Sequence, residues 1–262
     1  MRLVLVPTPI GNLEDITLRA LRTLKEAEVV ACEDTRRTGL LLRHYGIPTP
    51  TLRLDQHTLD RARELLAPYA YVAYATDAGT PGISDPGAEL VRLALEWGWR
   101  VEVLPGPTAL IPALVASGLP THRFTFEGFL PKGGRERRER LQALAREGRT
   151  AVLYESPHRL RKTLGDLMEV YGEAHPVAVA REISKVHEEV FRGSLKEAWA
   201  RFAEPKGEFV LVLGPKEAPA PDAERLLAEL KGQGLSGKAL FRALVAAGVA
   251  RNEAYRLSME ER

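Results

Sequence analysis

Residues 71–91 read YVAYATDAGTPGISDPGAELV, where a short apolar run enters a loop rich in glycine and proline before a helical pattern begins. The run at 71–75 has the length and composition of a buried strand. In open α/β sheets, ligands bind outside the carboxyl ends of the strands, and glycines let the backbone approach a ligand without an intervening Cβ. This loop is therefore predicted to border a ligand site.

Two further loops have the same character. PTPIGNLEDIT (7–17) follows an apolar run at 3–6, and PGPTALIPALVASG (105–118) follows another at 101–104. If the three strands are neighbours in one sheet, their loops line a single cleft. Three independent tight turns would give the same pattern, so the spacing alone leaves both interpretations open.

Alternation of apolar runs with helical patterns predicts an α/β protein. Further strands are expected at 29–32, 124–126, 151–154, 177–180, 188–191 and 209–213. The stretch SGLPTHR (117–123) follows a helical run and contains Gly118 and Pro120. It is the expected boundary between an N-terminal α/β domain, 1–118, and a C-terminal α/β domain, 119–214.

The end of the chain differs in composition from the rest. The Pro/Ala-rich stretch KEAPAPDAE (216–224) is typical of a linker and leads into an expected small helical bundle at 222–262. Three short helices are expected there, with Asp222 and Ser236 as N-caps and Gly248 as a C-terminal stop. The bundle suits contact with a nucleic-acid backbone, or else packing or dimerisation. The basic residues proposed for such contact are Lys231, Lys238, Arg242, Arg251 and Arg256.

Composition excludes several classes of protein. Hydrophobic residues make up 45% of the 262 residues and charged residues 27%, which excludes disordered and fibrous chains. No stretch approaches the ~20 apolar residues of a membrane span, so no membrane partner is expected. The one cysteine, Cys32, is expected to be a buried thiol in a reducing cytoplasm, and without a Cys/His cluster no metal is expected.

A net charge of +2 is too even to indicate a nucleic-acid partner, but one segment is strongly basic. PKGGRERRERLQALAREGR (131–149) has seven basic and three acidic side chains. Leu141, Ala143 and Leu144 suit the buried edge of a helix whose arginines face solvent. The segment is either an ordinary exposed helix or a phosphate-contacting face. The RNA-binding candidates on it are Arg135, Arg137, Arg138 and Arg140.

Seven segments, taken together and in order, resemble the tetrapyrrole methylase superfamily over residues 3–214. They are PTPIGNLEDIT (7–17), ACEDTRRT (31–38), DAGTPGISDPG (77–87), PGPTALIPALVASGLP (105–120), FEGFLP (126–131), YESPHRL (154–160) and GEFVLVLG (207–214). The resemblance is strongest to the branch that 2′-O-methylates a cytidine of 16S ribosomal RNA. This chain has Gly79-Thr80-Pro81, as that branch does, where the tetrapyrrole enzymes commonly have Gly-Asp-Pro.

The resemblance implies a tetrapyrrole-methylase-like fold of two α/β domains, with S-adenosylmethionine in the cleft between them, and a homodimer. The implied partner is 16S ribosomal RNA or the 30S ribosomal subunit. Matching positions imply a set of cofactor-binding residues: Pro9, Gly79, Thr80, Pro81, Ile83, Thr108, Ala109, Phe126, Tyr154, Glu155, Ala180 and also Phe209. The alternatives are a corrinoid or porphyrin methyltransferase and a non-enzymatic ribosome-binding protein.

Methyl transfer from a sulfonium needs in-line positioning and no metal, and a ribose hydroxyl gains from a base within hydrogen-bond reach. ACEDTRRT places two acids beside two arginines directly after a strand, which suits proton abstraction and phosphate clamping. The alternative is ordinary capping of the next helix by Asp34 or Thr35. YESPHRL offers a second acid and arginine at another strand end. The catalytic candidates are Glu33, Asp34, Arg36, Glu155 and Arg159.

Overall fold

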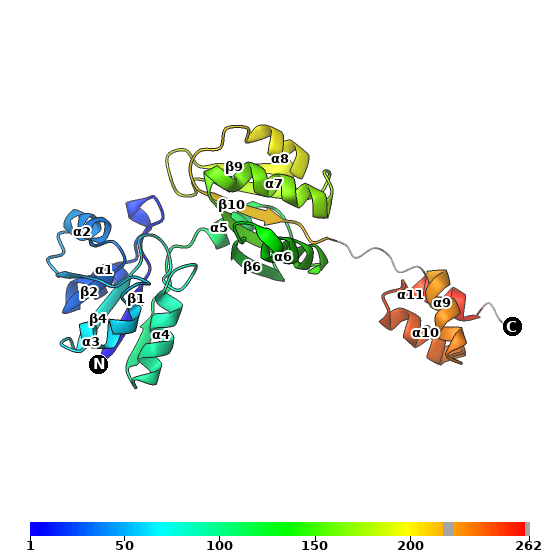
Figure 1. Cartoon of the computed structure of the whole chain (residues 1–262), viewed down its shortest axis with the longest axis horizontal. Coiled ribbons are helices and arrows are strands. Elements are labelled where there is room, and N and C mark those ends of the chain that lie inside the picture. The colour runs from blue at the N-terminus through cyan, green and yellow to red at the C-terminus, as the bar shows by residue number, and fades with distance from the viewer. Residues whose placement is uncertain (217–222, 260–262) are drawn as a thin grey trace.

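The computed structural model describes residues 1–216 and 223–259, and it contains two five-stranded sheets and a separate group of helices (Figure 1). The first sheet has the order β3-β2-β4-β1-β5, with all neighbours parallel. Its strands are β1 (Arg2–Val6), β2 (Val29–Cys32), β3 (Thr51–Arg53), β4 (Tyr71–Ala75) and β5 (Arg100–Val103). The loops at 7–17, 77–87 and 105–109 therefore follow neighbouring strands, β1, β4 and β5, as the cleft interpretation requires.

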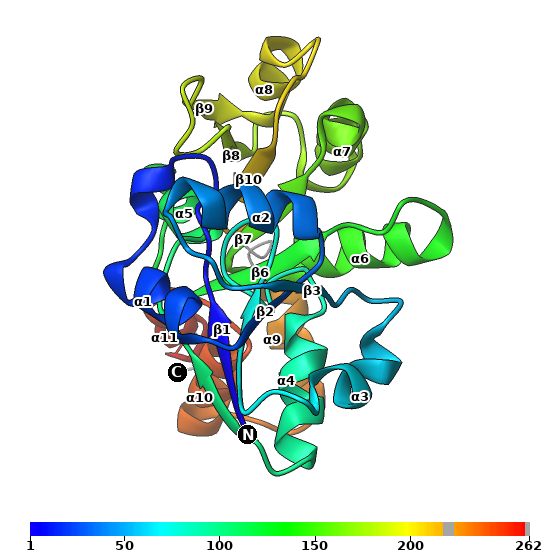
Figure 2. The same cartoon turned by 90° about the vertical axis from the view of Figure 1, so that its left-hand side faces the viewer.

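Both faces of the first sheet are covered by helices, which explains why its central strands are apolar at every position after Arg2 of β1 (Figure 2). Leu3 and Leu5 point to the face covered by α3 (Ala62–Leu66) and α4 (Gly87–Glu96). Val4 and Val6 point to the face covered by α1 (Leu18–Glu26) and α2 (Thr35–His44). Two short 3₁₀ turns, at Leu13–Asp15 and Leu59–Arg61, complete this half.

The second sheet is mixed and has the order β6-β7-β10-β8-β9. Its strands are β6 (Phe124–Phe129), β7 (Thr150–Glu155), β8 (Pro176–Arg181), β9 (Glu189–Ser194) and β10 (Phe209–Leu213). Only β6 and β7 pair in parallel; β10 runs antiparallel between β7 and β8. The carboxyl ends of β6, β7 and β8 and the start of β10 consequently meet at one edge.

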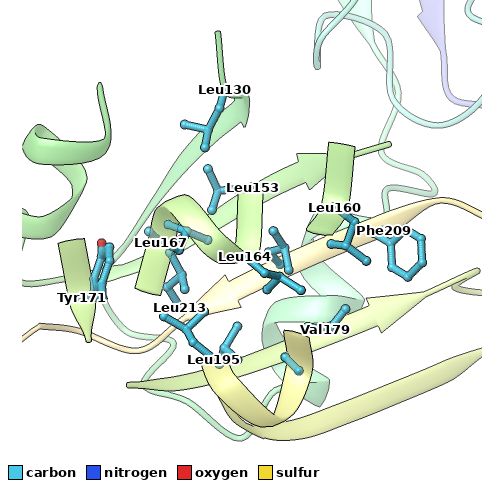
Figure 3. Close-up of a cluster of buried hydrophobic side chains, with 14 of the residues drawn as sticks. Leu130, Leu153, Leu160, Leu164, Leu167, Tyr171, Val179, Leu195, Phe209 and Leu213 are labelled. Carbon is cyan, nitrogen blue, oxygen red and sulfur yellow. The ribbon is translucent and has the colours of Figure 1, made fainter. Parts of the chain in front are cut away.

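One face of the second sheet packs on α6 (Gly134–Arg146), α7 (Pro157–Tyr171) and α8 (Leu195–Arg201). Leu160, Leu164 and Leu167 of α7 lie over Leu153, Leu211 and Leu213 of the strands in this apolar layer (Figure 3). The opposite face packs on α5 (Leu110–Ala116). The expected boundary at residue 118 assigns α5 to the N-terminal half, whereas its buried side chains belong to the core of the second sheet.

The three expected terminal helices are present as α9 (Ala223–Gly232), α10 (Gly237–Ala246) and α11 (Arg251–Met259). They enclose a core of their own, which includes Leu240, Leu244 and Leu257. Ser236 occupies the N-cap position of α10, and Gly248 lies beyond its end with φ +93°. The other expected N-cap, Asp222, lies outside the described residues.

The α/β class and the nine expected strands are confirmed; three strands have the expected bounds, and the ends of the others shift by up to three residues. β3 was missed because it is a three-residue edge strand with no apolar run to mark it. Cys32 is buried at the end of β2, as expected. In the part of the chain that the structure describes, no helix is both long and apolar enough to cross a membrane.

Candidate active site

Acidic side chains gather at the carboxyl edge of the first sheet, because parallel strands all end there. Glu33 follows β2, Asp55 follows β3 and Asp77 follows β4, while Asp85 comes from the glycine-rich loop. Burial raises the pKa of the Glu33 carboxyl, and the negative charges of Asp85, Asp77 and Asp55 raise it further. Glu33 therefore binds a proton more readily than an ordinary glutamate does.

The three sequence loops are joined to one another by hydrogen bonds. Thr8 and Gly79 exchange backbone hydrogen bonds, with N···O distances of 3.0 and 2.9 Å. The Thr80 hydroxyl donates to the Pro107 carbonyl at 2.8 Å, which ties the loop after β4 to the loop after β5. Gly79 has φ +83°, a conformation that glycine adopts without strain. The loops thus form one rigid rim rather than three independent turns.

The loop after β4 is closed by its own aspartate. Asp85 accepts hydrogen bonds from the backbone nitrogens of Gly82 at 2.8 Å and Gly87 at 2.7 Å. The chain therefore turns back on itself before α4 begins at Gly87. One carboxylate both shapes the loop and contributes charge to the acidic cluster.

A cavity of about 560 Å³ opens between this rim and the edge of the second sheet. Its lining comes from both halves of the chain: Ile10, Glu33, Arg37, Thr76, Asp77, Ala78, Gly79, Thr80, Ile83, Ser84, Asp85, Thr108, Ala109, Phe129, Tyr154, Glu155, Ser156, Pro157, Ala180, Ile183, Glu208, Phe209 and Val210. This volume lies within the range of roughly 300–1,000 Å³ of small-molecule sites. Most of the wall is apolar, with carboxylates at a few points.

Glu155 is the buried carboxylate of the second-sheet wall, and it is 2% exposed. It accepts hydrogen bonds from the Ser156 backbone nitrogen at 2.8 Å and the Thr163 hydroxyl at 2.6 Å. The Arg159 guanidinium lies 3.5 Å away and also donates to the carbonyls of Leu130 and Pro131. A buried charge is stable only with such partners, so Glu155 is held in one orientation on the cavity wall.

Thr163 connects Glu155 to α6 through a second buried residue. The Arg137 guanidinium donates to the Thr163 hydroxyl at 2.8 Å, to Asp166 at 2.6 Å and to the Pro131 carbonyl at 2.9 Å. Arg137 is 3% exposed. The expectation that Arg137 contacts RNA is therefore wrong, because its hydrogen bonds are satisfied inside the protein by residues of α7 and the preceding loop.

The other expected RNA-binding arginines remain on the solvent side of α6. Arg135 pairs with Glu139 along the helix, and Arg140 lies 3.3 Å from Glu127. Arg138 is exposed. Two of these three arginines are thus matched by nearby carboxylates.

Of the expected cofactor residues, eight line the cavity: Gly79, Thr80, Ile83, Thr108, Ala109, Tyr154, Glu155 and Ala180. Phe209, suggested by the same match, also lines it. Pro9, Pro81 and Phe126 do not. Phe126 instead packs on the Tyr154 ring, with 4.9 Å between ring centroids. A bulge between Phe126 and Gly128 shifts the strand register, and it is Phe129 that reaches the cavity.

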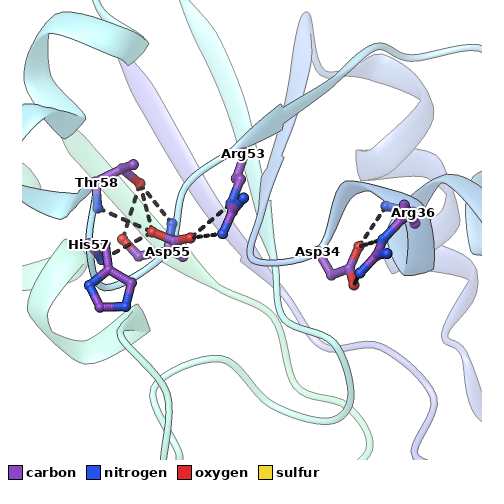
Figure 4. A network of polar contacts seen from close by, with 6 residues as sticks. All are labelled: Asp34, Arg36, Arg53, Asp55, His57 and Thr58. Atoms are coloured by element: carbon purple, nitrogen blue, oxygen red, sulfur yellow. Dashed lines mark hydrogen bonds and ion pairs between the residues drawn. The ribbon is translucent and has the colours of Figure 1, made fainter.

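Of the expected catalytic residues, Glu33 and Glu155 line the cavity, whereas Asp34, Arg36 and Arg159 do not. Asp34 is the N-cap of α2 and accepts from the Arg36 backbone and side chain (Figure 4). The capping interpretation therefore explains this pair. Asp55 is similarly occupied by Arg53, His57 and Thr58.

Sequence reasoning included Arg37 among the two arginines of ACEDTRRT but did not rank it as a catalytic candidate, and it missed Asp77 and Asp85 as members of the site. Arg37 lies 3.3 Å from Asp77 at the cavity edge. Both aspartates follow β4 in the loop that marked the site, so their position was available as a signal. Within residues 1–216 and 223–259, no three His, Cys, Asp or Glu side chains gather closely enough to hold a metal ion.

Replacing Arg137 with Ala should lower the free energy of unfolding by roughly 1.5–3 kcal/mol, because it removes charged hydrogen bonds and leaves buried partners unpaired. Arg135→Ala, on the exposed side of the same helix, should change it by less than about 0.5 kcal/mol. Urea unfolding of the two variants makes the comparison. If both variants changed the free energy of unfolding by the same small amount, Arg137 would contribute no more to stability than a solvent-facing arginine does.

Comparisons with known proteins agree with this geometry. The profile of the family described as Tetrapyrrole (Corrin/Porphyrin) Methylases matches residues 2–199. The proteins named ribosomal RNA small subunit methyltransferase I from Synechocystis and Escherichia coli O157:H7 are 47% and 44% identical. Each alignment covers 99% of this chain, with 92% and 95% of the relative.

Among solved structures, uroporphyrin-III C-methyl transferase from Thermus thermophilus, complexed with S-adenyl homocysteine, has a TM-score of 0.60 and 27% identity. That match covers 82% of this chain and 97% of the other. Diphthine synthase, at a TM-score of 0.63 and 15% identity over 82% and 90% of the two chains, shares the fold. The chain therefore belongs to the tetrapyrrole methylase family and, within it, to the ribosomal RNA small subunit methyltransferase I proteins.

Proposed function

We propose that this protein uses S-adenosylmethionine to methylate ribosomal RNA of the small subunit, and specifically the ribose 2′-oxygen of a cytidine in 16S ribosomal RNA. The observation that carries the proposal is the cavity between the two sheets, with a raised-pKa carboxylate on its wall. The names of relatives at 44–48% identity support ribosomal RNA as the class of acceptor. The choice of the cytidine 2′-oxygen rests on the motif resemblance.

The residues of the cavity fit such a donor. Ile83, Ala109 and Val210 provide apolar contact for a flat base, and the backbone of the Gly79 loop is open to hydrogen bonding. The wall carries five carboxylates and one arginine, which suits a ligand with cationic groups and ribose hydroxyls. A bound sulfonium donor supplies an activated methyl group and an uncharged thioether leaving group.

The chain itself has to position the acceptor and accept its proton. Glu33 faces the cavity from the first sheet, opposite the Tyr154 and Glu155 wall of the second. Its raised pKa makes it a stronger base than an ordinary glutamate. We assign to Glu33 the removal of the ribose hydroxyl proton. Glu155, already hydrogen-bonded to Thr163 and Ser156, is held on the cavity wall beside the donor.

Three acceptors distinguish the proposed function from its alternatives. Donor with a labelled methyl group is incubated separately with under-modified 30S subunits, naked 16S ribosomal RNA and a tetrapyrrole precursor. If the label enters RNA and digestion of that RNA releases labelled 2′-O-methylcytidine, the proposal is supported. Comparison of the 30S subunits with the naked RNA then shows which form is the substrate. Label in the tetrapyrrole would support the small-molecule alternative. If the donor left the melting temperature of the protein unchanged, the result would support the third alternative, a non-enzymatic ribosome-binding protein.

The homodimer implied by the resemblance and the cytoplasmic location expected from the single cysteine also stay predictions. Light scattering of the full chain tests the first, and fractionation of cells tests the second. Neither is needed for the chemistry assigned to Glu33.

Gly79→Val should abolish donor binding. The residue has φ +83°, which a β-branched side chain rarely adopts, and a Cβ there would lie 3.3 Å from Ile10 Cγ2, so the loop must move. Calorimetric titration with donor measures the loss, and circular dichroism checks the fold. The control is Gly165→Ala on α7, where a Cβ meets nothing within 4 Å. Unchanged donor affinity in Gly79→Val would contradict the role of this loop.

Glu33→Gln should lower kcat/KM by about 10²–10⁴-fold and remove the acid limb of its pH profile. In the wild type, activity should fall as the pH drops through a pKa above the usual 4.5, because protonated Glu33 is not a base. Asp34→Asn, which keeps a capping side chain on α2, is the matched control and should retain the limb. A wild-type-like rate for Glu33→Gln would exclude Glu33 as the base.

The same substitution should stabilise the protein at neutral pH. The folded chain binds the Glu33 proton more tightly than the unfolded chain, so ionisation costs stability as the pH rises through the folded pKa. Gln removes that cost, and the gain in unfolding free energy should be larger at pH 7 than at pH 4. A variant that is less active but more stable distinguishes a functional acid from a structural one.

A further inference from the structure

A second cavity, of about 1160 Å³, lies on the terminal helices α9–α11, and we name it the tail groove. Its lining residues are Lys231, Ser236, Gly237, Lys238, Leu240, Phe241, Arg242, Arg251, Asn252, Tyr255, Leu257, Ser258 and Met259. Four of them are cationic and none is acidic. Residues 223–259 do contain Glu224, Glu229 and Glu253, so the carboxylates of this segment lie away from the groove.

Three of the groove cations can bind an anionic ligand without first breaking an ion pair within the protein. Lys238, Arg242 and Arg251 are exposed and form no ion pair with another residue of the described chain. Lys238 and Arg242 are four residues apart on α10 and therefore share a face of the helix. On α6, in contrast, Arg135, Arg137 and Arg140 each have a carboxylate partner. Unpaired cations around a concavity indicate an anionic ligand.

The groove also offers the groups that recognise nucleotides. Tyr255 is 58% exposed and meets Phe241 edge to face, with 6.2 Å between ring centroids. An exposed aromatic ring beside cations suits stacking on an unpaired base. Ser236 and Asn252 add neutral hydrogen-bonding groups to the same lining.

Other occupants suit the groove less well. A second copy of the chain in a symmetric contact would bring the same cations against each other, which is repulsive. A membrane surface requires an apolar helix face to insert, whereas Leu240 and Leu244 of α10 are buried in the core of the three helices. We infer that the tail groove binds the phosphate backbone of the RNA acceptor, an inference that rests on the proposed function for the identity of the acceptor as RNA.

The test is RNA binding by the full chain at several salt concentrations, measured by fluorescence anisotropy with a 16S ribosomal RNA fragment. The variant K238A/R242A/R251A should reduce the slope of log affinity against log salt by about 2, and affinity at 0.1 M salt by about 10–100-fold. Tyr255→Ala should weaken binding at every salt concentration with the slope unchanged, and Tyr255→Phe should restore it. Calorimetric affinity for the methyl donor should stay at the wild-type value in all variants.

The matched control is R22A/K25A/R63A, which removes the same charge from exposed positions of the N-terminal half and should leave the slope unaltered. An equal loss in this control, or an unaltered slope in the groove variant, would overturn the inference. Tighter wild-type binding to anionic phosphatidylserine vesicles than to RNA, lost in the groove variant, would assign the groove to membranes instead. Wild-type protein that methylates no RNA refutes the proposed function, whereas normal methylation and an unaltered KM for RNA in the groove variant refute only this inference.

Discussion

The pair of backbone hydrogen bonds between Thr8 and Gly79 is the constraint on which the site depends. The bonds extend contact between β1 and β4 beyond the ends of the strands, and the Thr80 to Pro107 bond adds the loop after β5. Loops fixed in this way lose little conformational entropy when a ligand binds, because they are already ordered. The site is therefore preorganised by main-chain interactions that tolerate few side chains, which explains the glycine, threonine and proline content of the loop.

Ordering these loops also concentrates negative charge. Glu33, Asp77 and Asp85 share one sheet edge, and their mutual repulsion destabilises the fold to the extent that Glu33 is ionised. Arg37 offsets part of this repulsion through Asp77. Asp85 has a structural role, because it closes the loop after β4, but that role does not account for Glu33. The cluster is therefore consistent with a functional role for Glu33, whose pKa is raised by burial and by its acidic neighbours.

The sequence predicted the fold and the rim of the site well because both depend on local signals. Apolar runs, glycine-rich loops and their order along the chain placed β1, β4 and β5 and eight of the expected cofactor residues at the cavity. Prediction from the sequence failed where the position of a side chain depends on partners that are far away along the chain. The hydrogen bonds of the Arg137 guanidinium are accepted by Thr163 and Asp166, which lie more than twenty residues away along the chain. No sequence pattern near Arg137 indicates these partners. The prediction that Phe126 lines the cavity failed because a bulge changed the register of β6.

The acidic character of the cleft explains why RNA affinity has to come from elsewhere. The cavity lining carries five carboxylates, those of Glu33, Asp77, Asp85, Glu155 and Glu208. Arg37 is the one cationic side chain among the described residues that line it. Such a wall favours a cationic donor but repels the phosphates of an RNA acceptor. Favourable contacts with the backbone must then be made by cations outside the cavity. On α6 the charge of Arg135, Arg137 and Arg140 is largely matched within the protein, whereas Lys238, Arg242 and Arg251 of the tail groove form no ion pair with a residue that the structure describes. Charge is thus divided between two parts of one chain, with negative groups where the methyl is transferred and positive groups where the polymer is held.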